Sequence, residues 1–572
     1  MKTVIQAIFL FIIILTSSYS MQSQSWNWVN TIGSDRSDKV ITVRSDKESN
    51  VIVSGYFTNN IYLGNGVTLS RTVTTGVSKE AFVAKYDSNG TCLWARSAGG
   101  YFDDRVLGMD LDNFGNIYIT GTCWYTITMG PFFVGDPSGS SCCDQCFIAK
   151  LDKNGNWIWA NWAGGYGDDQ GLDLVTDAIG NTYVAGFMAD NTGIILGGTG
   201  PATSIAPLNV GMHVYNYWVA KIDSHGVWQW GQSFGNLPWD PAHYKYVERD
   251  NAISIDGEGG VYITGGFDST RYFGTTSLTS NGGTDVFLMK IDTGGAFKWA
   301  ISGGSTKDDW CNGVSADSMG HVYITGEHRD SFNFGSVAIK NYDKRDVFVA
   351  KFDASNGDCI WGKRAGSKAG SERGNDVIAN RQCKVYVTGD IGEKANFGSH
   401  IETDSTGSIN NFLARISVDG DWIWAITGGS SDSSDRSNSV TIAPNNAVYI
   451  SGNIKLPGTY GLITVPVVGK TDGFFACVRD VSQLDTCGEV APNSIFNHMN
   501  TAMVKVYPNP VESILTIESM DKTHKLLYDI DGHLIFETDE SYINMADLAS
   551  GLYLLRIQNE QNEFVLKKIF KP

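Results

Sequence analysis

Carboxylate side chains crowd one short stretch of the sequence, Ala163–Gly186, which reads AGGYGDDQGLDLVTDAIGNTYVAG. In it Asp168 and Asp169 are adjacent, and Asp177 lies just before a turn. Two carboxylates in different environments could act as general acid and base, and acids spaced around glycine could bind calcium. Carboxylates also accept backbone N–H groups in loops, which would make these acids architectural. The choice depends on whether the stretch is unique.

The stretch is one of seven copies of a repeat. A motif of the form (V/T)Y(I/V)xG begins at Val51, Ile117, Thr182, Val261, Val322, Val385 and Val448. A motif of the form FxAKxD begins at Phe82, Phe147, Trp218, Phe287, Phe348, Phe412 and Phe474. Tryptophans recur with nearly even spacing at Trp28, Trp94, Trp159, Trp230, Trp299, Trp361 and Trp424. Self-similarity at such a period predicts a repeat architecture.

Each repeat predicts four strands joined by tight turns. Short β-branched and aromatic runs alternate with Asp, Asn and Gly turns, which tolerate positive φ and suit hairpins. The chain starts with a tryptophan strand, SWNWVNTIG, and its last repeat stops after the third strand, FFACVRD. We therefore expect an all-β, seven-bladed β-propeller of four-stranded antiparallel blades over residues 21–480, closed by the N-terminal strand.

The repeats resemble the SBBP-type β-propeller repeat family of bacterial exported proteins. The family pattern, W…GG…D…D-x-x-GN-x-Y-(V/I)-TG, appears here as WANWAGGYGDDQGLDLVTDAIGNTYVAG. The resemblance covers roughly residues 25–480. It implies an architecture and says almost nothing about activity.

The acid eight residues before the Asp177 position recurs in every repeat. The seven acids are Asp38, Asp104, Asp169, Glu248, Asp309, Glu372 and Asp435. A catalytic site needs one asymmetric pair, so a residue repeated in this way is expected to serve the crossing between blades, held by backbone amides. The cations of the third strands, Lys85, Lys150, Lys221, Lys290, Lys351 and Arg415, are candidate ion-pair partners. A metal or ligand ring near the axis, and catalysis, are the alternatives.

No cofactor is predicted, and calcium is left open. The turns DNFGN at Asp112 and DKNGN at Asp152 resemble fragments of calcium loops but lack the glutamate at position twelve. The Asp177 position itself is interpreted as a turn acceptor. The sequence contains no HExxH pair, G-x-S-x-G elbow or phosphate loop.

Ten cysteines are present, and the densest group is Cys142, Cys143 and Cys146, with Cys123 one strand earlier. Four thiolates could bind zinc, but an exported chain and two adjacent cysteines favour disulfides. A second disulfide, between Cys477 and Cys487, would close a short loop at the end of the last repeat.

A ligand site is expected where the loops depart from the repeat. The longest connection between a second and a third strand, Asp190–Tyr217, is followed by an unusually long crossing to the next repeat, FGNLPWDPAHYKYVERD. Both fall on one face, and together they offer His213, Tyr215, Tyr217, Trp239, His243, Tyr244 and Tyr246. Such side chains suit a glycan or a protein partner. Alternatively, the two insertions pack on each other.

The ends and the charge of the chain predict export. Residues 1–20 have the layout of a secretory signal peptide, and no later apolar run is long enough to span a bilayer. The formal net charge of −18 and a pI of about 4.9 repel phosphate backbones, so nucleic-acid binding is not expected. Residues 481–504 break the repeat and are interpreted as a linker.

Residues 505–572 predict a small β-sandwich and resemble the type A C-terminal sorting domain of the type IX secretion system. The marks are Tyr507-Pro508-Asn509-Pro510, the run Leu548–Tyr553 with Gly551 and Tyr553, and the basic end Lys567–Lys571. The resemblance implies contact with the type IX secretion machinery, removal of the tail, and release or attachment to surface lipopolysaccharide. It also implies a secreted or outer-surface location in a Gram-negative bacterium.

The regularity of the repeats favours a non-enzymatic surface or secreted propeller that binds a glycan or a protein. A secreted hydrolase or lyase is the main alternative, and it should show unlike acids, His or Arg near the axis at positions that do not repeat. A purely structural envelope protein is the third possibility.

Overall fold

The computed structural model describes residues 24–480 and 504–571, apart from gaps at residues 73–77, 136–142, 190–192, 198–202, 209–214, 238–250, 343, 369, 381–383, 393, 399, 404–408, 432–434, 508–510, 512, 520–522, 529–533, 547 and 560–563. The predicted signal peptide, residues 1–20, and all of the predicted linker except Val504 lie outside these residues. Contacts divide the chain into two compact units, Met1–Asp485 and Thr486–Pro572. Every helix or strand assigned in the described residues is a β-strand, and they contain no helix that could cross a membrane.

The described residues of the first unit form seven antiparallel sheets of four repeat strands, sheets 1 to 7. The first strands are β2 (Lys39–Ser45), β8 (Asp104–Leu111), β14 (Asp169–Thr176), β20 (Asn251–Ile255), β26 (Trp310–Ala316), β32 (Arg373–Ala379) and β38 (Arg436–Ile442). The second strands are β3 (Val51–Phe57), β9 (Ile117–Trp124), β15 (Thr182–Met188), β21 (Gly260–Phe267), β27 (His321–His328), β33 (Val385–Gly392) and β39 (Ala447–Ile454).

The third and fourth strands complete the sheets. The third strands are β6 (Glu80–Tyr86), β12 (Asp144–Leu151), β18 (Tyr215–Ile222), β24 (Asp285–Asp292), β30 (Asp346–Asp353), β36 (Ile409–Ile416) and β42 (Asp472–Arg479). The fourth strands are β7 (Cys92–Ala98), β13 (Trp157–Gly164), β19 (Trp228–Leu237), β25 (Phe297–Gly303), β31 (Cys359–Ala365), β37 (Trp422–Ser430) and β1 (Trp26–Ile32). Second strands such as β3 are buried along their whole length, because neighbouring sheets cover both of their sides.

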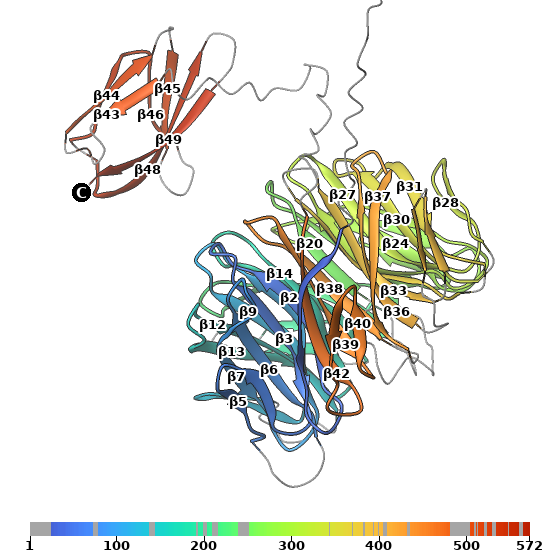
Figure 1. The fold of residues 1–572 in the computed structure, drawn as a ribbon. Helices are drawn as coiled ribbons and strands as arrows, with labels where there is room; N and C mark the ends of the chain where they lie inside the picture. Colours follow the sequence, from blue (N-terminus) through green and yellow to red (C-terminus); the bar gives the residue numbers. More distant parts are fainter. Residues whose placement is uncertain are drawn as a thin grey trace, which may run out of the picture. The chain divides into compact units, whose positions relative to one another are not determined.

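The two ends of this unit meet in sheet 7. Strand β1 pairs antiparallel with β42, as the chain order predicted, with Val29 opposite Ala476 and Ile32 opposite Gly473. Figure 1 shows β1 (blue) beside the orange strands of the last repeat. Each first strand contacts the next one, from β2 through β8, β14, β20, β26 and β32 to β38, and β38 contacts β2.

Each sheet carries a short hairpin that the sequence did not reveal, inserted between its second and third strands. The hairpins are β4 (Ile61–Gly64) with β5 (Val67–Leu69), β10 (Thr126–Met129) with β11 (Phe132–Gly135), β16 (Ile194–Leu196) with β17 (Thr203–Ile205), β22 (Thr270–Phe273) with β23 (Thr276–Thr279), β28 (Phe332–Phe334) with β29 (Val337–Ile339), β34 (Lys394–Phe397) with β35 (His400–Thr403), and β40 (Gly458–Tyr460) with β41 (Ile463–Val465). The first hairpin strands β16 and β40 pair with the fourth strands β13 and β37 of the preceding sheets and so cover those edges, whereas the second hairpin strands contact the fourth strands of their own sheets.

Connections from fourth to first strands and from second to third strands lie on one face, the loop face. The tight turns between first and second and between third and fourth strands lie on the opposite face, the turn face. This arrangement follows from the antiparallel order of each sheet.

Neighbouring sheets are joined on the turn face by a set of repeated residues, which we term the turn joint. Lys290 Nζ and Trp299 Nε1 of sheet 4 both donate to the carbonyl oxygen of Ala354 in a turn of sheet 5, at 2.9 and 3.3 Å. Lys290 also lies over the ring of Tyr262, 5.1 Å from its centroid. Equivalent pairs reach the next sheet from Lys150 and Trp159 to Ser224, from Lys221 and Trp230 to Thr293, and from Lys351 and Trp361 to Val418.

The predicted ion pairs between these cations and the repeated acids are wrong. Lys85 lies opposite Ile52, whereas Asp38 bonds to Thr58 beyond the other end of the same strand. At 3.3 Å per residue, these ends are about 16 Å apart. Lys85 instead pairs with the turn acid Asp46 at 2.8 Å, and Lys290 lies 3.9 Å from Asp256.

The sequence predicts disulfides within the group Cys123, Cys142, Cys143 and Cys146, with no pairing specified, but Cys123 and Cys146 form none. Both thiols are free and buried. Cys123 lies opposite Gln145, so Cys123 and Cys146 face opposite sides of the sheet and belong to different parts of the core. Cys142 and Cys487, the other predicted partners, lie outside the described residues.

The second unit consists of two small antiparallel sheets. One has the order β43 (Val504–Tyr507), β44 (Ile514–Ser519) and β47 (Tyr542–Asn544). The other has the order β46 (Leu534–Thr538), β45 (Thr523–Tyr528), β48 (Gly551–Asn559) and β49 (Phe564–Lys571). Their core includes Leu515, Leu527, Ile543 and Leu555, in agreement with the alternating pattern of the tail.

Replacing Trp361 by alanine is predicted to destabilise the first unit. The variant loses a buried indole and its 2.8 Å bond to Val418, so we expect a decrease in the free energy of unfolding of about 3–5 kcal/mol. Urea denaturation followed by circular dichroism measures this change. Trp124→Ala, at an exposed position, is the matched control. Equal urea midpoints for the two variants would contradict the role of the turn joint.

Candidate functional site

The repeated acids are buried, and they fasten the loop before each first strand. Asp309 accepts the backbone N–H groups of Ser305 and Arg329, at 2.5 and 2.9 Å. The same bonds are made by Asp38 to Ser34 and Thr58, and by Asp435 to Ser430 and Lys455. Asp104 accepts from Gly100, Asp169 from Ala189, and Glu372 from the hydroxyl of Ser367. Glu248 lies outside the described residues.

A second buried acid at the start of the third strand faces several of these carboxylates. Burial is the main cause that raises the pKa of Glu372 to about 8, and the charge of Asp346 acts in the same direction. Burial likewise raises the pKa of Asp285 to about 7, and that of Asp309 to about 6. Within the described residues, Glu372 Oε2 and Asp346 Oδ1 have no hydrogen-bond partner. At pH 7 Glu372 is therefore mostly protonated, and Asp285 is about half protonated.

The turn acids have their oxygens occupied by turn donors. Asp112 accepts the N–H groups of Phe114 and Asn116, the Asn116 amide and the Tyr118 hydroxyl. Asp177 accepts from Ile179 and Asn181 in the same way, which fits the interpretation as a turn acceptor. Among the described residues, no three His, Cys, Asp or Glu side chains are grouped as a metal site would need.

Two of the aromatic residues predicted to bind a ligand are instead part of the core. Tyr215 and Tyr217 are only 4% and 0% exposed, because both lie on the buried strand β18. Tyr217 stacks on Phe234, and its hydroxyl donates to the carbonyl of Gly266. His213, Trp239, His243, Tyr244 and Tyr246 lie outside the described residues.

A different set of aromatic side chains is exposed on the loop face, at sheet 2. This aromatic cluster comprises Tyr101 and Phe102, in the loop before β8, and Trp124 and Tyr125, at the end of β9. The ring centroids of Phe102 and Trp124 are 5.2 Å apart, with 30° between their planes. Tyr101 is 73% exposed and Trp124 44%.

The backbone at this cluster is strained. Tyr125 has φ of 76°, a left-handed conformation that side chains other than glycine rarely adopt. Ser269, at the equivalent position of sheet 4, has φ of 55°, so this conformation also occurs in a connection outside the cluster.

Comparing equivalent positions around the repeats would have found Trp124. Trp124 lies three residues after the glycine that ends the (V/T)Y(I/V)xG motif of its repeat. The same place in the other repeats holds Thr58, Ala189, Asp268, Arg329, Gly392 and Lys455. A large aromatic residue therefore occurs there once. An exposed residue that differs from those at the equivalent positions is not needed to maintain the repeat.

The first strands of all seven described sheets line a central cavity of about 160 Å³, which adjoins one of about 520 Å³ that opens at the turn face. Register identifies two equivalent positions in these strands. One is occupied by Thr42, Gly108, Asp173, Ala252, Gly313, Asp376 and Ser439, and the other by Arg44, Asp110, Val175, Ser254, Ser315, Ile378 and Thr441. The unlike charges here were missed by the sequence analysis.

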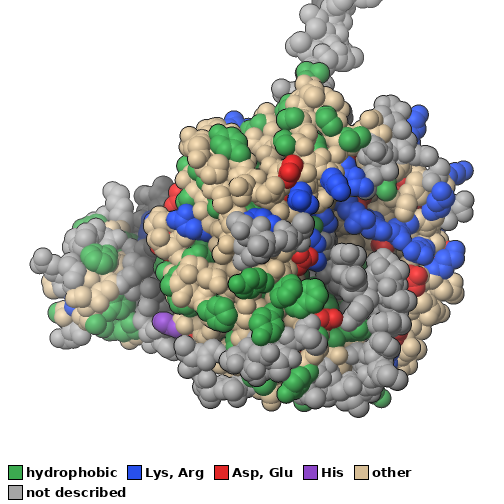
Figure 2. All heavy atoms as spheres, turned by 90° about the horizontal axis from the view of Figure 1, so that it is seen from below, with side chains coloured by type: hydrophobic (Ala, Val, Ile, Leu, Met, Phe, Trp, Pro, Cys, Tyr) green, Lys and Arg blue, Asp and Glu red, His purple; other side chains and the backbone are tan. Residues whose placement is uncertain are grey.

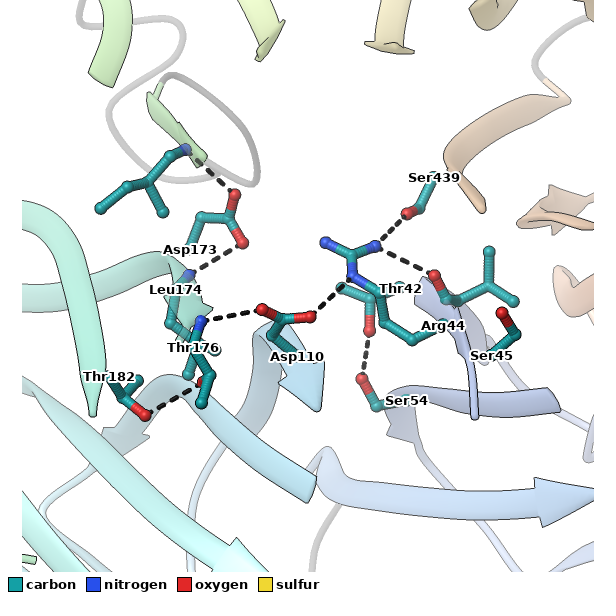
Figure 3. A network of polar contacts seen from close by, with 12 residues as sticks. Thr42, Arg44, Ser45, Ser54, Asp110, Asp173, Leu174, Thr176, Thr182 and Ser439 are labelled. Carbon is teal, nitrogen blue, oxygen red and sulfur yellow. Dashed lines mark hydrogen bonds and ion pairs between the residues drawn. The ribbon is translucent and has the colours of Figure 1, made fainter. Parts of the chain in front are cut away.

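A polar network crosses the cavity (Figure 3). The Arg44 guanidinium lies between Asp110, 3.7 Å away, and the Ser439 hydroxyl, 3.1 Å away. Asp110 accepts the N–H of Thr176, and Asp173 accepts those of Leu174 and Ile253. Burial raises the pKa of Asp173 to about 7, whereas Arg44 lowers it.

Most oxygens in this network satisfy backbone groups of the adjacent first strand. Ser254 accepts the N–H of Ala316, Ser315 that of Ala379, and Asp376 that of Val440. Both equivalent positions therefore link neighbouring sheets, through either a hydroxyl or a carboxylate. The network is thus explained by the need of backbone N–H groups at the strand edges for hydrogen-bond acceptors. Its only further chemical capacity is proton transfer at Asp173 near neutral pH.

The sorting motif predicted in the tail is described in part. Tyr507 ends β43 and is exposed, whereas Tyr553 is buried and donates its hydroxyl to the carbonyl of Ala549, at 2.6 Å. Gly551 begins β48. Pro508, Asn509 and Pro510 lie outside the described residues.

Residues 505–571 match the secretion system C-terminal sorting domain. This domain implies that the protein is handled by type IX secretion and is secreted or displayed at the cell surface. The match covers only the tail and leaves the repeats unassigned.

Known proteins similar to the whole chain are distant. The uncharacterized WD repeat-containing protein L264 of Acanthamoeba polyphaga mimivirus is 22% identical over 540 residues, which cover 80% of this chain. The match spans only 38% of that protein's length.

Two solved structures resemble the fold weakly. A protein of unknown function from Dyadobacter fermentans DSM 18053 gives a TM-score of 0.37 at 10% identity, covering 80% of this chain and 100% of the other. The polysaccharide lyase Uly1 gives a TM-score of 0.36 at 10% identity, covering 82% of this chain and 94% of the other.

The raised pKa of Glu372 predicts that stability decreases as pH rises. The unfolded chain loses this proton near the ordinary pKa of 4.5, but the folded chain keeps it until about pH 8. The stability that the neutral carboxyl contributes is therefore present below pH 4.5 and lost between pH 4.5 and 8. Glu372→Gln keeps an uncharged side chain that can donate to Asp346.

Urea midpoints measured from pH 5 to 8.5 test this expectation. The midpoint of the unaltered protein should fall with pH, and that of E372Q should fall less. Glu258→Gln, at an exposed site, is the control and should follow the unaltered protein. Parallel curves for E372Q and the unaltered protein would show that Glu372 is ionised at neutral pH.

Proposed function

We propose that residues 21–480 form a closed seven-bladed β-propeller of SBBP-type repeats that binds a glycan outside the cell and catalyses no reaction. The cyclic contacts of the first strands and the pairing of β1 with β42 support the closed ring. The matched tail supports export. We further propose that the tail engages the type IX machinery, is then removed, and leaves the propeller either released or attached to surface lipopolysaccharide.

The aromatic cluster carries the binding proposal. Its four rings are exposed, although burying them would stabilise the fold, and Trp124 has no aromatic counterpart at the equivalent position of the other repeats. The tilted pair of Phe102 and Trp124 offers a rigid apolar surface with little conformational entropy to lose. Sugar rings have flat apolar faces that stack on such surfaces. A protein partner could use the same rings as anchors, and it is the alternative outcome of the test.

Trp124→Ala is predicted to weaken glycan binding. Probing the mature full-length protein on an array of bacterial and algal polysaccharides should give binding that the variant reduces at least tenfold, corresponding to about 1.4 kcal/mol. Tyr272→Ala removes an exposed aromatic ring from another sheet and serves as the control. Binding that survives in W124A, or binding only to proteins, would refute the glycan proposal.

A secreted hydrolase or lyase is the second candidate function, and the unlike charges of Arg44, Asp110 and Asp173 favour it. A carboxyl with pKa about 7 is suited to acid–base chemistry. Our proposal predicts no turnover in a panel of polysaccharide and ester substrates at pH 5–9. Activity that peaks near neutral pH and is lost in Asp173→Asn but kept in Glu258→Gln would establish the enzyme instead.

A further inference from the structure

Cations gather at the loop-face end of the first strands, in a protein whose net charge is −18. Arg373 and Arg436 begin β32 and β38, and the register places Lys39 of β2 and Arg105 of β8 at the same position. The other described residues at this position are Gln170 and Trp310. Because first strands contact one another, these cations lie around the mouth of the central cavity.

Two more arginines join this group at sheet 5 and form with Arg373 and Arg436 what we term the arginine cluster. Arg329 follows β27, and Arg345 precedes β30. Glu327 Oε2 forms ion pairs with both Arg345 Nη1, 3.2 Å away, and Arg373 Nε, 2.8 Å away. Arg436 Nε lies 3.9 Å from Asp390, and Arg329 Nη1 lies 3.6 Å from Asp308.

The acids of the cluster orient these arginines without neutralising them. Four guanidinium groups face three carboxylates. Burial lowers the pKa of Arg345, Glu327 raises it, and the charges of Arg373, Arg329 and Arg436 lower it again, so the four guanidinium groups repel one another. Arg373 and Arg436 approach their acids through Nε, at 2.8 and 3.9 Å. The side chain of Arg436 is 46% exposed.

The same face carries the aromatic cluster across the cavity mouth. In Figure 2, a band of basic side chains reaches a hollow near the centre of the face, and hydrophobic side chains gather on its other side. A polymer that crosses the mouth can therefore contact both.

We propose that the arginine cluster binds the carboxylate or sulfate groups of an acidic polysaccharide whose sugar rings stack on the aromatic cluster. This inference rests on the proposed glycan-binding function and adds the charge of the ligand. Guanidinium groups held by acids at Nε present their terminal donors as a planar fork, which matches the paired oxygens of a carboxylate or sulfate.

Polygalacturonate and its fully methyl-esterified form test the charge requirement, with dextran sulfate and dextran as a second pair. Binding to the mature full-length protein is measured by biolayer interferometry at 50 and 200 mM salt. We expect the charged member of at least one pair to bind ten times or more tightly than its neutral partner, and its affinity to decrease with salt.

The double variant R373Q/R436Q should lower affinity for the charged polymer at least tenfold and flatten its salt dependence. The matched control K153Q/K298Q removes two exposed cations from the turn face and should leave binding unchanged. R436Q alone, at the most exposed position, keeps the test valid if the double variant unfolds. R373K/R436K keeps the charge but loses the fork, and an intermediate affinity is expected.

Each outcome separates the inference from the proposed function. Equal binding of charged and neutral polymers, lost in W124A, would overturn the arginine site and keep the glycan function. Charge-dependent binding that R436Q leaves intact would overturn the site as well. Duplex DNA that binds as tightly as the acidic polysaccharides would show a general polyanion surface and refute the polysaccharide assignment.

Discussion

The hydrogen bonds from a lysine and a tryptophan of one sheet to a single turn carbonyl of the next are the contact on which the rest of the first unit depends. In sheets 4 and 5, this contact joins Lys290, Trp299 and Ala354. The lysine is largely buried, and a buried ammonium is stable only where acceptors surround it. The carbonyl, the face of Tyr262 and the turn acid Asp256 provide this environment. Three motifs that appear separate in the sequence are thus parts of one joint.

Because the joint and the buried acids occupy the repeated positions, chemistry that is not repeated must come from elsewhere. Both candidates follow this rule. The cavity residues Arg44, Asp110 and Asp173 occupy positions that the other sheets fill with Gly, Ala, Ser, Thr, Val or Ile, except for Asp376 at the Asp173 position. Trp124 and Arg329 share one equivalent position in different sheets, so one scaffold site supports an aromatic contact in sheet 2 and a cationic contact in sheet 5.

The sequence was sufficient for features that depend on local pattern. Strand order, the Asp-centred turns and the pairing of β1 with β42 follow from period and chain order. Partners across sheets were not predictable, because they depend on which strand end a residue occupies. Asp38 and Lys85 belong to one repeat, yet their strand ends are about 16 Å apart. The sequence predicts a loop at Tyr215, because composition does not define the end of an irregular connection. In the structure, strand β18 begins at that residue.

The two faces differ in how freely they can vary. On the turn face, the third-to-fourth turns of sheets 3 to 6 each place a carbonyl for the joint and end in a glycine with positive φ, although the sheet 5 turn is one residue longer and the sheet 6 turn begins with Ser417. On the loop face, the repeated acid needs only one or two backbone amides, which a loop of almost any sequence provides. Asp104, for example, accepts the N–H of Gly100, directly before the exposed Tyr101 and Phe102. The loops can therefore exchange side chains while the sheets keep their contacts, which explains why aromatic and basic residues accumulate there in an otherwise acidic protein.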